Sequence, residues 1–190
     1  MIIEGIVTTV NSDGSTNISP MGPIVDAEMN HLRLRPFNTS TTYKNLKRTG
    51  EGVFHVTDDV MLLARAAVGQ IDVEPELICL DAIKSPVLAD ACRWYAFRVI
   101  DIDDTEERVS MNVDVVERGV LREFCGFNRA KHAVLEAAIL ATRVDFIPHD
   151  EILAELDRLA APVEKTAGTQ EREAFAFLNR YILAKVSADV

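Results

Sequence analysis

Residues 31–46 of the chain read HLRLRPFNTSTTYKNL, and they are the most informative segment for predicting the fold. Its first part alternates, so that a strand would place His31, Arg33 and Arg35 on one face and two leucines on the other. Four consecutive hydroxyl residues, 39–42, then begin a sequence typical of a helix, which Gly50 ends in the usual way. The stretch therefore predicts a half-buried strand followed closely by a hydroxyl-capped helix over residues 39–48.

The same stretch is a candidate phosphate site. The start of a helix presents unpaired N–H groups and a partial positive charge. Arginine side chains and hydroxyl donors beside it complete a set of groups suited to phosphate. The alternative is that the arginines lie on a solvated strand face and the hydroxyls only cap the helix. A basic cluster is unusual in a chain whose formal net charge is −10, and this favours a binding site.

Upstream, residues 15–23 read STNISPMGP, a strand-like segment broken by proline and glycine. Pro20, Gly22 and Pro23 are incompatible with a regular central strand, so a kinked strand or an exposed loop is expected. Such a segment can bring backbone N–H and C=O groups close to a flat ligand. The alternative is an ordinary bend at the corner of a barrel.

The rest of the first 125 residues predicts further strands and a second helix. The strands are expected in residues 1–10, 52–57, 92–101 and 107–117, and the helix, capped by Asp58, in residues 58–68. Turn residues at 103–105 join the last two strands into a hairpin.

From residue 126 the pattern becomes helical. Helices are predicted over residues 128–144, 150–161 and 169–186, with Asn128 as the N-cap of the first and Pro162 ending the second. Strands followed by helices make an α+β pattern. The predicted organisation is a β-rich domain of residues 1–125 and a helical region of residues 126–190 packed on it.

The composition limits the kind of partner. The acidic excess argues against nucleic acid and against anionic lipid, which both require clustered Lys and Arg. No apolar run is long enough to span a membrane, and the N-terminus lacks the features of a signal peptide. Cys79, Cys92 and Cys125 are widely spaced, which indicates reduced thiols. These features predict a cytoplasmic protein with no membrane or nucleic-acid partner.

Several chemistries lack their sequence signatures. The histidines have no metal-ligand spacing, so no metal site is predicted. The chain has no dinucleotide-binding glycine motif, no P-loop and no nucleophile elbow. The sequence therefore identifies no catalytic residue.

Taken together, the motifs resemble those of a known superfamily. Their order is an Asn-x-Ser-Pro loop, a strand ending in Arg-Pro-Phe, hydroxyls before a Tyr-x-Asn-Leu helix, then Thr-Gly-Glu and a Val-Phe-His-Val strand. This order resembles the split barrels of the flavin reductase type, which bind flavin mononucleotide (FMN). More narrowly, the chain resembles the family known as domain of unknown function 447. That family also has a helix like GFNRAK at residues 126–131, with EAA at 136–138 and ATR at 141–143.

The resemblance implies an α+β fold: an antiparallel split β-barrel of about six strands, of Greek-key type, with a C-terminal helical region. It also implies a homodimer with FMN near the subunit interface. The positions that match phosphate contacts are Arg35, Thr39, Ser40, Thr41 and Thr42. Those that match the flavin ring site are Asn17, Ile18, Ser19, Pro20 and Met21, with Asn45 as the family's helix asparagine. Many members have Ser or Thr where this chain has Met21-Gly22, so backbone groups are expected to contact the ring edge here.

One more candidate lies on the first helix predicted after residue 126. Arg129, His132 and Glu136 form one stripe along it. Arg129, with Lys131, would reach the phosphate or an anionic substrate. The alternative is a solvated face on which His132 and Glu136 make a weak pair.

The resemblance leaves the reaction open. The first hypothesis is an FMN-dependent oxidoreductase of the flavin reductase type, with NADH, NADPH or a reduced pterin as redox partner. The second is a non-catalytic flavin-binding or interaction module linked to pterin-dependent one-carbon metabolism. The third is a split barrel that has lost flavin and binds another phosphorylated ligand.

Overall fold

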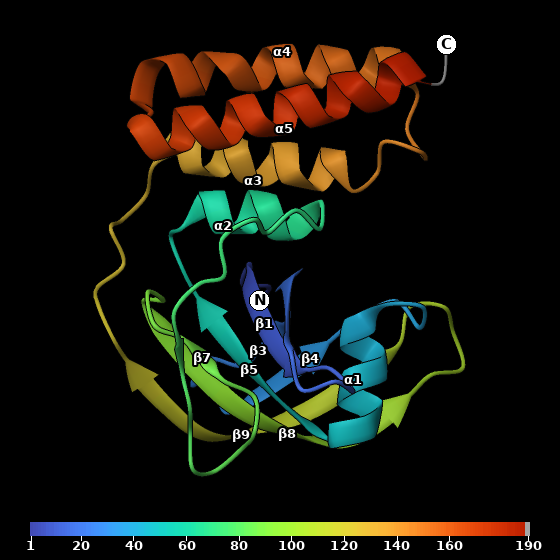
Figure 1. Ribbon diagram of the computed structural model, residues 1–190, viewed down its shortest axis with the longest axis vertical. Helices are drawn as coiled ribbons and strands as arrows, with labels where there is room; N and C mark the ends of the chain where they lie inside the picture. The colour runs from blue at the N-terminus through green and yellow to red at the C-terminus, as the bar shows by residue number, and fades with distance from the viewer. Residues whose placement is uncertain (189–190) are drawn as a thin grey trace. The chain divides into compact units, whose positions relative to one another are not determined.

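The structure, a computed structural model, describes residues 1–188 and separates them into two compact units (Figure 1). The barrel unit comprises Met1–Thr57 and Val73–Phe124. The helical unit comprises Asp58–Asp72 and the chain from Cys125 onward. Each unit has a hydrophobic core of its own.

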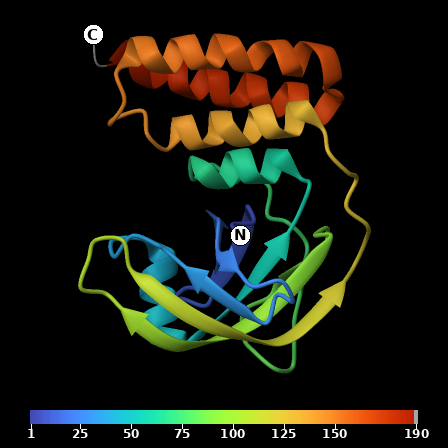
Figure 2. The same ribbon diagram turned by 180° about the vertical axis from the view of Figure 1, so that it is seen from behind.

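The barrel unit is built on one antiparallel sheet in the order β2-β1-β5-β8-β9-β4-β3. Its long hairpin and the strand β4 beside β9 can be followed in Figure 2. The strands are β1 Gly5–Val10, β2 Thr16–Met21, β3 Ile24–Val25, β4 His31–Leu34, β5 Glu51–Val56, β8 Arg93–Asp103 and β9 Ser110–Val120. A second, two-stranded sheet pairs β6 Leu77–Ile78 with β7 Val87–Leu88.

The main sheet curls until its two ends approach each other. The end strands β2 and β3 are consecutive in the chain and are separated only by Gly22 and Pro23. The N-terminal residues connect the ends, because Ile2 bridges Ile24 and the Val25 N–H donates to the Met1 carbonyl at 2.8 Å. This half-open antiparallel barrel, followed by helices, confirms the predicted α+β split-barrel fold.

The predicted break between residues 17 and 25 has a clear place in this barrel. Pro20 lies in β2, which pairs only with β1 among the described residues. An outer strand tolerates proline because a missing N–H there need not remove a ladder hydrogen bond. Gly22 and Pro23 then separate β2 from β3.

Side-chain alternation places β4 as predicted. Leu32 and Leu34 are buried, while His31 and Arg33 are exposed. The barrel core adds the large apolar residues of the neighbouring strands and of α1 Thr41–Thr49, among them Val7, Leu46, Phe54, Phe97 and Met111. Gly50 ends α1 in the left-handed region, with φ 70° and its N–H bonded to the Leu46 carbonyl.

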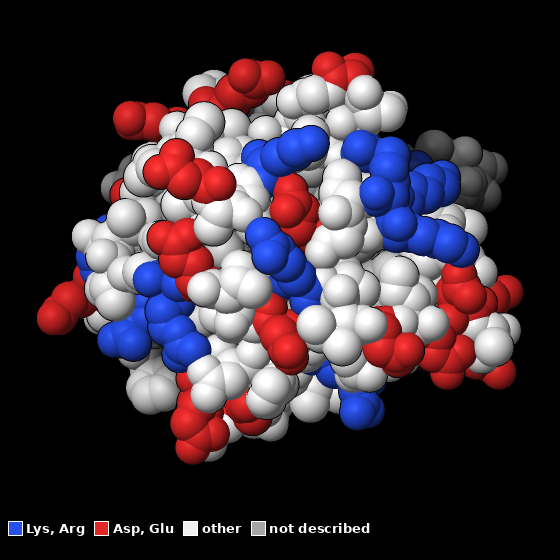
Figure 3. Space-filling model, turned by 90° about the horizontal axis from the view of Figure 1, so that it is seen from below, with Lys and Arg blue, Asp and Glu red and all other residues white. Residues whose placement is uncertain are grey.

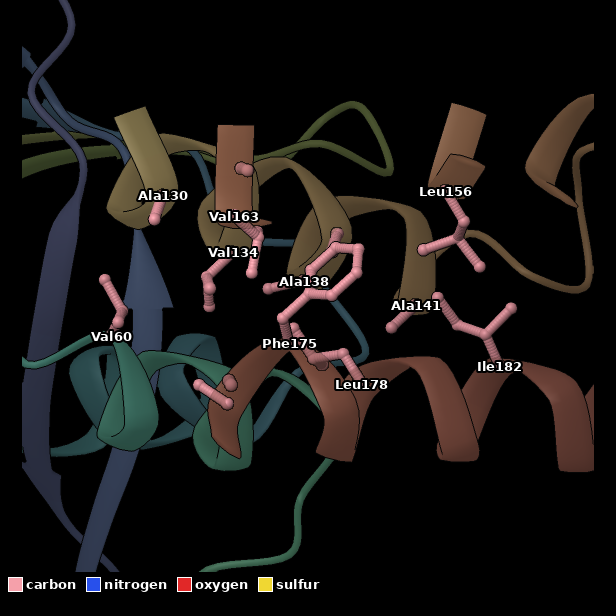
Figure 4. Close-up of a cluster of buried hydrophobic side chains, with 14 of the residues drawn as sticks. Val60, Ala130, Val134, Ala138, Ala141, Leu156, Val163, Phe175, Leu178 and Ile182 are labelled. Carbon is pink, nitrogen blue, oxygen red and sulfur yellow. The ribbon is translucent and has the colours of Figure 1, made fainter. Parts of the chain in front are cut away.

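The helical unit contains α2 Val60–Ala67, α3 Arg129–Ala141, α4 His149–Thr166 and α5 Thr169–Ala188. Helix α3 packs against the other three helices. Its buried face is small and apolar, and Figure 4 shows it opposite large side chains of α4 and α5. That face consists of Ala130, Ala133, Val134, Ala137, Ala138 and Ala141. Small residues allow close packing because the distance between two helix axes depends on the side chains between them.

Two details of the helices differ from the sequence prediction. Residues 58–72, placed with the barrel by the predicted division at residue 125, cluster with the helical unit, since Val60 and Ala64 of α2 are buried in its core. Pro162 does not end α4 but lies inside it. The helix continues for four more residues, and Val163 in this added turn is buried in the helical core.

None of the helices in residues 1–188 is long and apolar enough to cross a lipid bilayer.

Candidate functional site

One of the four hydroxyl residues at the start of α1 caps the helix. Ser40 is the N-cap: its Oγ accepts from the Tyr43 N–H at 3.2 Å and donates to the Phe37 carbonyl at 2.7 Å. Thr39 and Thr41 are exposed, and their hydroxyls make no hydrogen bond with any described residue. The capping role predicted as the alternative therefore applies to Ser40, whereas Thr39 and Thr41 are available to a ligand.

Thr42, Asn17 and Asn45 belong to a polar network between the start of α1 and the first two strands. Asn17 Nδ2 donates to the hydroxyls of Thr9 and Thr42, both at 3.1 Å. Asn45 Nδ2 donates to Thr9 Oγ1 at 3.1 Å and to Asn11 Oδ1 at 2.8 Å. Because Thr9, Thr42 and Asn45 are buried, these bonds hold the helix start against β2. The structure thus brings three predicted site residues together: Asn17 binds Thr42 directly, and Thr9 joins Asn17 to Asn45.

Thr9 and Asn11, which complete this network, were missed by the sequence analysis. A threonine near the end of a strand rich in β-branched residues, and an asparagine in a turn, are both common in those places. Both bind Asn45, which lies 36 positions from Thr9 and 34 from Asn11, and no local pattern marks this role.

Arg35 carries an unsatisfied buried group. Its Nε is buried and has no hydrogen-bond partner, although the residue as a whole is half-buried. By contrast, Arg33 Nε on β4 donates to Asn112 Oδ1 at 3.2 Å. A buried donor without an acceptor destabilises the fold. An anionic ligand beside Arg35 would supply the missing acceptor, and a phosphate is well suited to an arginine.

Positive charge gathers around α1. Residues 29–50 contain five Lys and Arg and no Asp or Glu, in a chain of net charge −10. One of the five is committed elsewhere: Lys47 Nζ lies 2.7 Å from Asp104 Oδ2, and this contact raises the Lys47 pKa. On the face shown in Figure 3, Lys and Arg gather in small groups separated by acidic residues. The local charge favours a small anion over an extended polyanion.

The strand β2 offers the second part of the candidate site. All six of its residues are half-buried, including Ile18, Ser19, Pro20 and Met21. Its side away from β1 pairs with no other described strand, so backbone N–H and C=O groups there are open to a ligand. Asn17 joins this strand directly to the start of α1 through Thr42.

A shallow depression of about 450 Å³ lies between α1 and the turn that joins β1 to β2. We call it the α1 depression. Two predicted site residues, Thr41 and Asn45, line it. Its full lining is Asn11, Ser12, Asp13, Thr41, Lys44, Asn45 and Arg48.

Arg129 belongs to the helical unit, whereas the other candidate site residues belong to the barrel unit. It is exposed at the first residue of α3 and forms no ion pair with any described residue. The role considered for Lys131 was wrong. Its Nζ lies 2.8 Å from Glu171 Oε1 and donates to the Asp58 carbonyl at 2.6 Å, so the ammonium is occupied within the helical unit.

This ion pair also determines the charge of its acid. Burial alone would raise the Glu171 pKa, but hydrogen bonds from Lys131 and from backbone N–H groups lower it overall. Glu171 therefore stays ionised and holds Lys131 in place.

His55 is the one fully buried histidine of the barrel unit and was not predicted as a site residue. Its Nδ1 donates to the Ile6 carbonyl, and its Nε2 accepts from the Leu88 N–H, both at 3.1 Å. Burial lowers its pKa to about 4. It is a neutral residue with both ring nitrogens bonded, which makes it a structural group.

Within residues 1–188, no group of three or more His, Cys, Asp or Glu side chains is arranged to hold a metal ion.

These features define a class of protein. The curled antiparallel sheet has the split-barrel fold of flavin reductase-like proteins. The chain belongs to the DUF447 family, whose N-terminal domain, described as a protein of unknown function, matches residues 3–122. The second domain of that family matches residues 128–180.

Solved structures support the same classification. An FMN-bound DUF447 protein from Methanosarcina mazei is 25% identical, with a TM-score of 0.82 over 95% of this chain and 94% of that one. Flavoredoxin of Desulfovibrio vulgaris is 10% identical, with a TM-score of 0.54 over 63% of this chain and 69% of its own. The styrene monooxygenase flavin reductase of Pseudomonas putida is 9% identical, with a TM-score of 0.51 over 62% and 77%. No curated protein sequence matches the chain.

Proposed function

We propose that this protein binds FMN on its barrel unit and acts as an FMN-dependent oxidoreductase. The observation that carries the proposal is the buried Arg35 Nε without an acceptor, in an acid-free segment that leads into a helix start. The full-length likeness to an FMN-bound protein of the same family supports it. An isolated flavin phosphate is a dianion at neutral pH, and these groups complement it.

The described residues fit FMN in two groups. Arg35, Thr39, Thr41 and the first N–H groups of α1 would hold the phosphate. The open side of β2, residues Thr16–Met21, would hold the flavin ring through backbone groups. Ser40, Thr42 and Asn45 contribute indirectly, because their hydrogen bonds cap α1 and fix its start against β2.

Flavin supplies the redox chemistry when it is bound, and the chain supplies position and electrostatics. Hydride transfer depends on stacking and alignment more than on a protein acid or base. This agrees with a site made of backbone groups, hydroxyls and an arginine. We infer no catalytic side chain, and the electron donor is proposed to be NADH, NADPH or a reduced pterin.

Two measurements test the proposal. Purified protein should be yellow, or become yellow with added FMN, and anaerobic NADH or NADPH should bleach it. Bound flavin that neither donor nor a reduced pterin bleaches would indicate a non-catalytic flavin-binding module instead. Protein that takes up no FMN at all would end the proposal.

We also propose that the protein is a cytoplasmic homodimer. The long hairpin β8–β9 exposes large apolar side chains, including Ile100, Val116 and Val120. Exposed apolar surface of this kind marks protein interfaces. The free thiols Cys79 and Cys125 are exposed, which suits a reducing compartment.

A further inference from the structure

The α1 depression has a basic wall made by one side of α1. Thr41, Lys44 and Arg48 are spaced by three and four residues, so they lie along one face of the helix, and all three line the depression. Lys47 has a different environment and pairs with Asp104. The wall therefore presents two cations and one hydroxyl to the same space.

Both cations have donors to spare. Lys44 is exposed, and its ammonium contacts no described acid or acceptor. Arg48 donates to the Val10 carbonyl and, at 3.2 Å, to Asn45 Oδ1, and both bonds use Nη2. These bonds anchor the guanidinium at the depression, and its other N–H groups have no partner among the described residues. An anchored arginine beside a free lysine is suited to a phosphate group.

The opposite wall is a carboxylate held in a fixed position. Asp13 Oδ1 accepts from the Ser15 N–H at 3.0 Å and from the Ser15 hydroxyl at 2.6 Å. These bonds lower the Asp13 pKa and keep it ionised, while Oδ2 takes part in neither. In dinucleotide-binding proteins either a carboxylate accepts hydrogen bonds from the ribose hydroxyls of NAD, or an arginine accommodates the 2′-phosphate of NADP. In the α1 depression the two cations would hold a 2′-phosphate, and Asp13 Oδ2 would accept from the free 3′-hydroxyl of the same ribose.

None of the seven residues that line the depression is aromatic or aliphatic. A nucleotide base would find nothing to stack on, whereas a sugar and a phosphate would find partners on both walls. We propose that the α1 depression binds the phosphorylated ribose of NADPH and so selects NADPH over NADH. The inference rests on the proposed function, in which a nicotinamide nucleotide reduces the flavin.

The same phosphomonoester chemistry has a second source, the 5′-phosphate of FMN. Thr41 belongs to both proposed sites and cannot separate them. Arg35 and Thr39, proposed to hold the flavin phosphate, do not line the depression, whereas Lys44 lines it and is not among the groups proposed to hold the flavin. Loss of Lys44 should therefore weaken binding of the donor without changing retention of the flavin.

The test uses FMN-loaded protein titrated calorimetrically with adenosine 2′,5′-bisphosphate, with adenosine 5′-monophosphate for comparison. Lys44→Ala should weaken bisphosphate binding about tenfold, because one charge-assisted hydrogen bond is lost. The control Lys84→Ala removes an equally exposed lysine of the barrel unit that lies outside the depression and should change nothing. In steady-state assays, Lys44→Ala should raise the KM for NADPH and leave that for NADH unchanged.

Equal bisphosphate affinity in the wild type and in Lys44→Ala would overturn the inference. So would binding of the monophosphate as tight as that of the bisphosphate. Faster loss of FMN from Lys44→Ala would assign the depression to the flavin phosphate and would also overturn it. If the protein takes up no flavin, the proposed function fails separately, and the bisphosphate titration of that protein still decides whether the depression binds a phosphorylated ribose.

Discussion

At the scale of single residues, His55 links the stability of the barrel unit to pH. Its pKa in the folded protein is about 4, below its ordinary value of 6.5, because burial disfavours the charged ring. Between these values the unfolded chain binds a proton that the folded chain does not. The stabilising contribution is thus complete above pH 6.5 and is lost as the pH falls toward 4.

We expect His55 to remove about 2 kcal/mol from the free energy of unfolding between pH 7 and pH 5. Denaturant titrations at the two pH values would measure this in the wild type and in His55→Gln, which cannot titrate. The variant should be less stable at pH 7 and less sensitive to acid. Asp114 raises the pKa of His31, so protonation of His31 stabilises the folded protein as the pH falls, and this contribution is the same in the wild type and the variant. Equal acid sensitivity in the two proteins would contradict this account of His55.

At the scale of elements, the start of α1 separates residues that would touch the ligand from residues that position the helix. Thr41 is exposed with an unbonded hydroxyl, whereas Asn45 is buried and bonded to Thr9 and Asn11. We expect Thr41→Ala to weaken FMN binding with no change in stability. Asn45→Ala should weaken FMN binding and also lower the free energy of unfolding by about 1–3 kcal/mol, because it leaves buried polar groups without hydrogen-bond partners. Thermal unfolding and FMN titration of both variants measure this, and equal stability of the two would refute the positioning role.

The close packing of the small, apolar face of α3 can be tested by substitution. Ala137 is fully buried against the other helices of its unit, and the neighbouring Glu136 is exposed. Ala137→Leu should destabilise the protein by about 1–3 kcal/mol because the core has no room for the larger side chain. The control Glu136→Leu adds similar apolar bulk on the exposed side and should stay within about 0.5 kcal/mol of the wild type. If denaturant unfolding gives the same free energy of unfolding for Ala137→Leu and Glu136→Leu, α3 is not closely packed.

Local signals made most of these elements predictable. The alternation in residues 31–34 fixed the strand β4, and the hydroxyls and Gly50 marked the two ends of α1. The interruption predicted from Pro20, Gly22 and Pro23 lies at Gly22 and Pro23, while the strand β2 continues through Pro20. Each of these signals acts within a few residues of its effect.

Effects that depend on distant partners were not predictable. α4 continues through Pro162, although proline usually ends a helix, and Val163 in the following turn is buried. The sequence indicated that Lys131 could contact a ligand, but in the structure its ammonium pairs with Glu171, which is forty residues away in the chain. For the site, the sequence predicted which residue types lie at the start of α1. It did not predict that Ser40 and Thr42 form hydrogen bonds within the protein, or that the buried Arg35 Nε has no acceptor.

At the scale of the whole molecule, the exposed apolar residues of β8–β9 predict a dimer. Light scattering coupled to size exclusion should give twice the chain mass of 21.1 kDa. Ile100→Glu combined with Val120→Lys should shift the protein toward the monomer. The control Val73→Glu changes a still more exposed apolar residue outside this hairpin and should leave the oligomeric state unchanged. A monomeric wild type would contradict the proposed homodimer.

The proposed function depends above all on Arg35 and the start of α1, which would hold the phosphate of a flavin nucleotide. The most direct measurement compares the affinities for FMN and for riboflavin, which lacks the phosphate, in the wild type and in Arg35→Gln. We expect the wild type to bind FMN more tightly than riboflavin, and Arg35→Gln to weaken FMN binding about tenfold while leaving riboflavin binding unchanged. A wild type that binds the two flavins equally well, or an Arg35→Gln variant that binds FMN as tightly as the wild type, would contradict it.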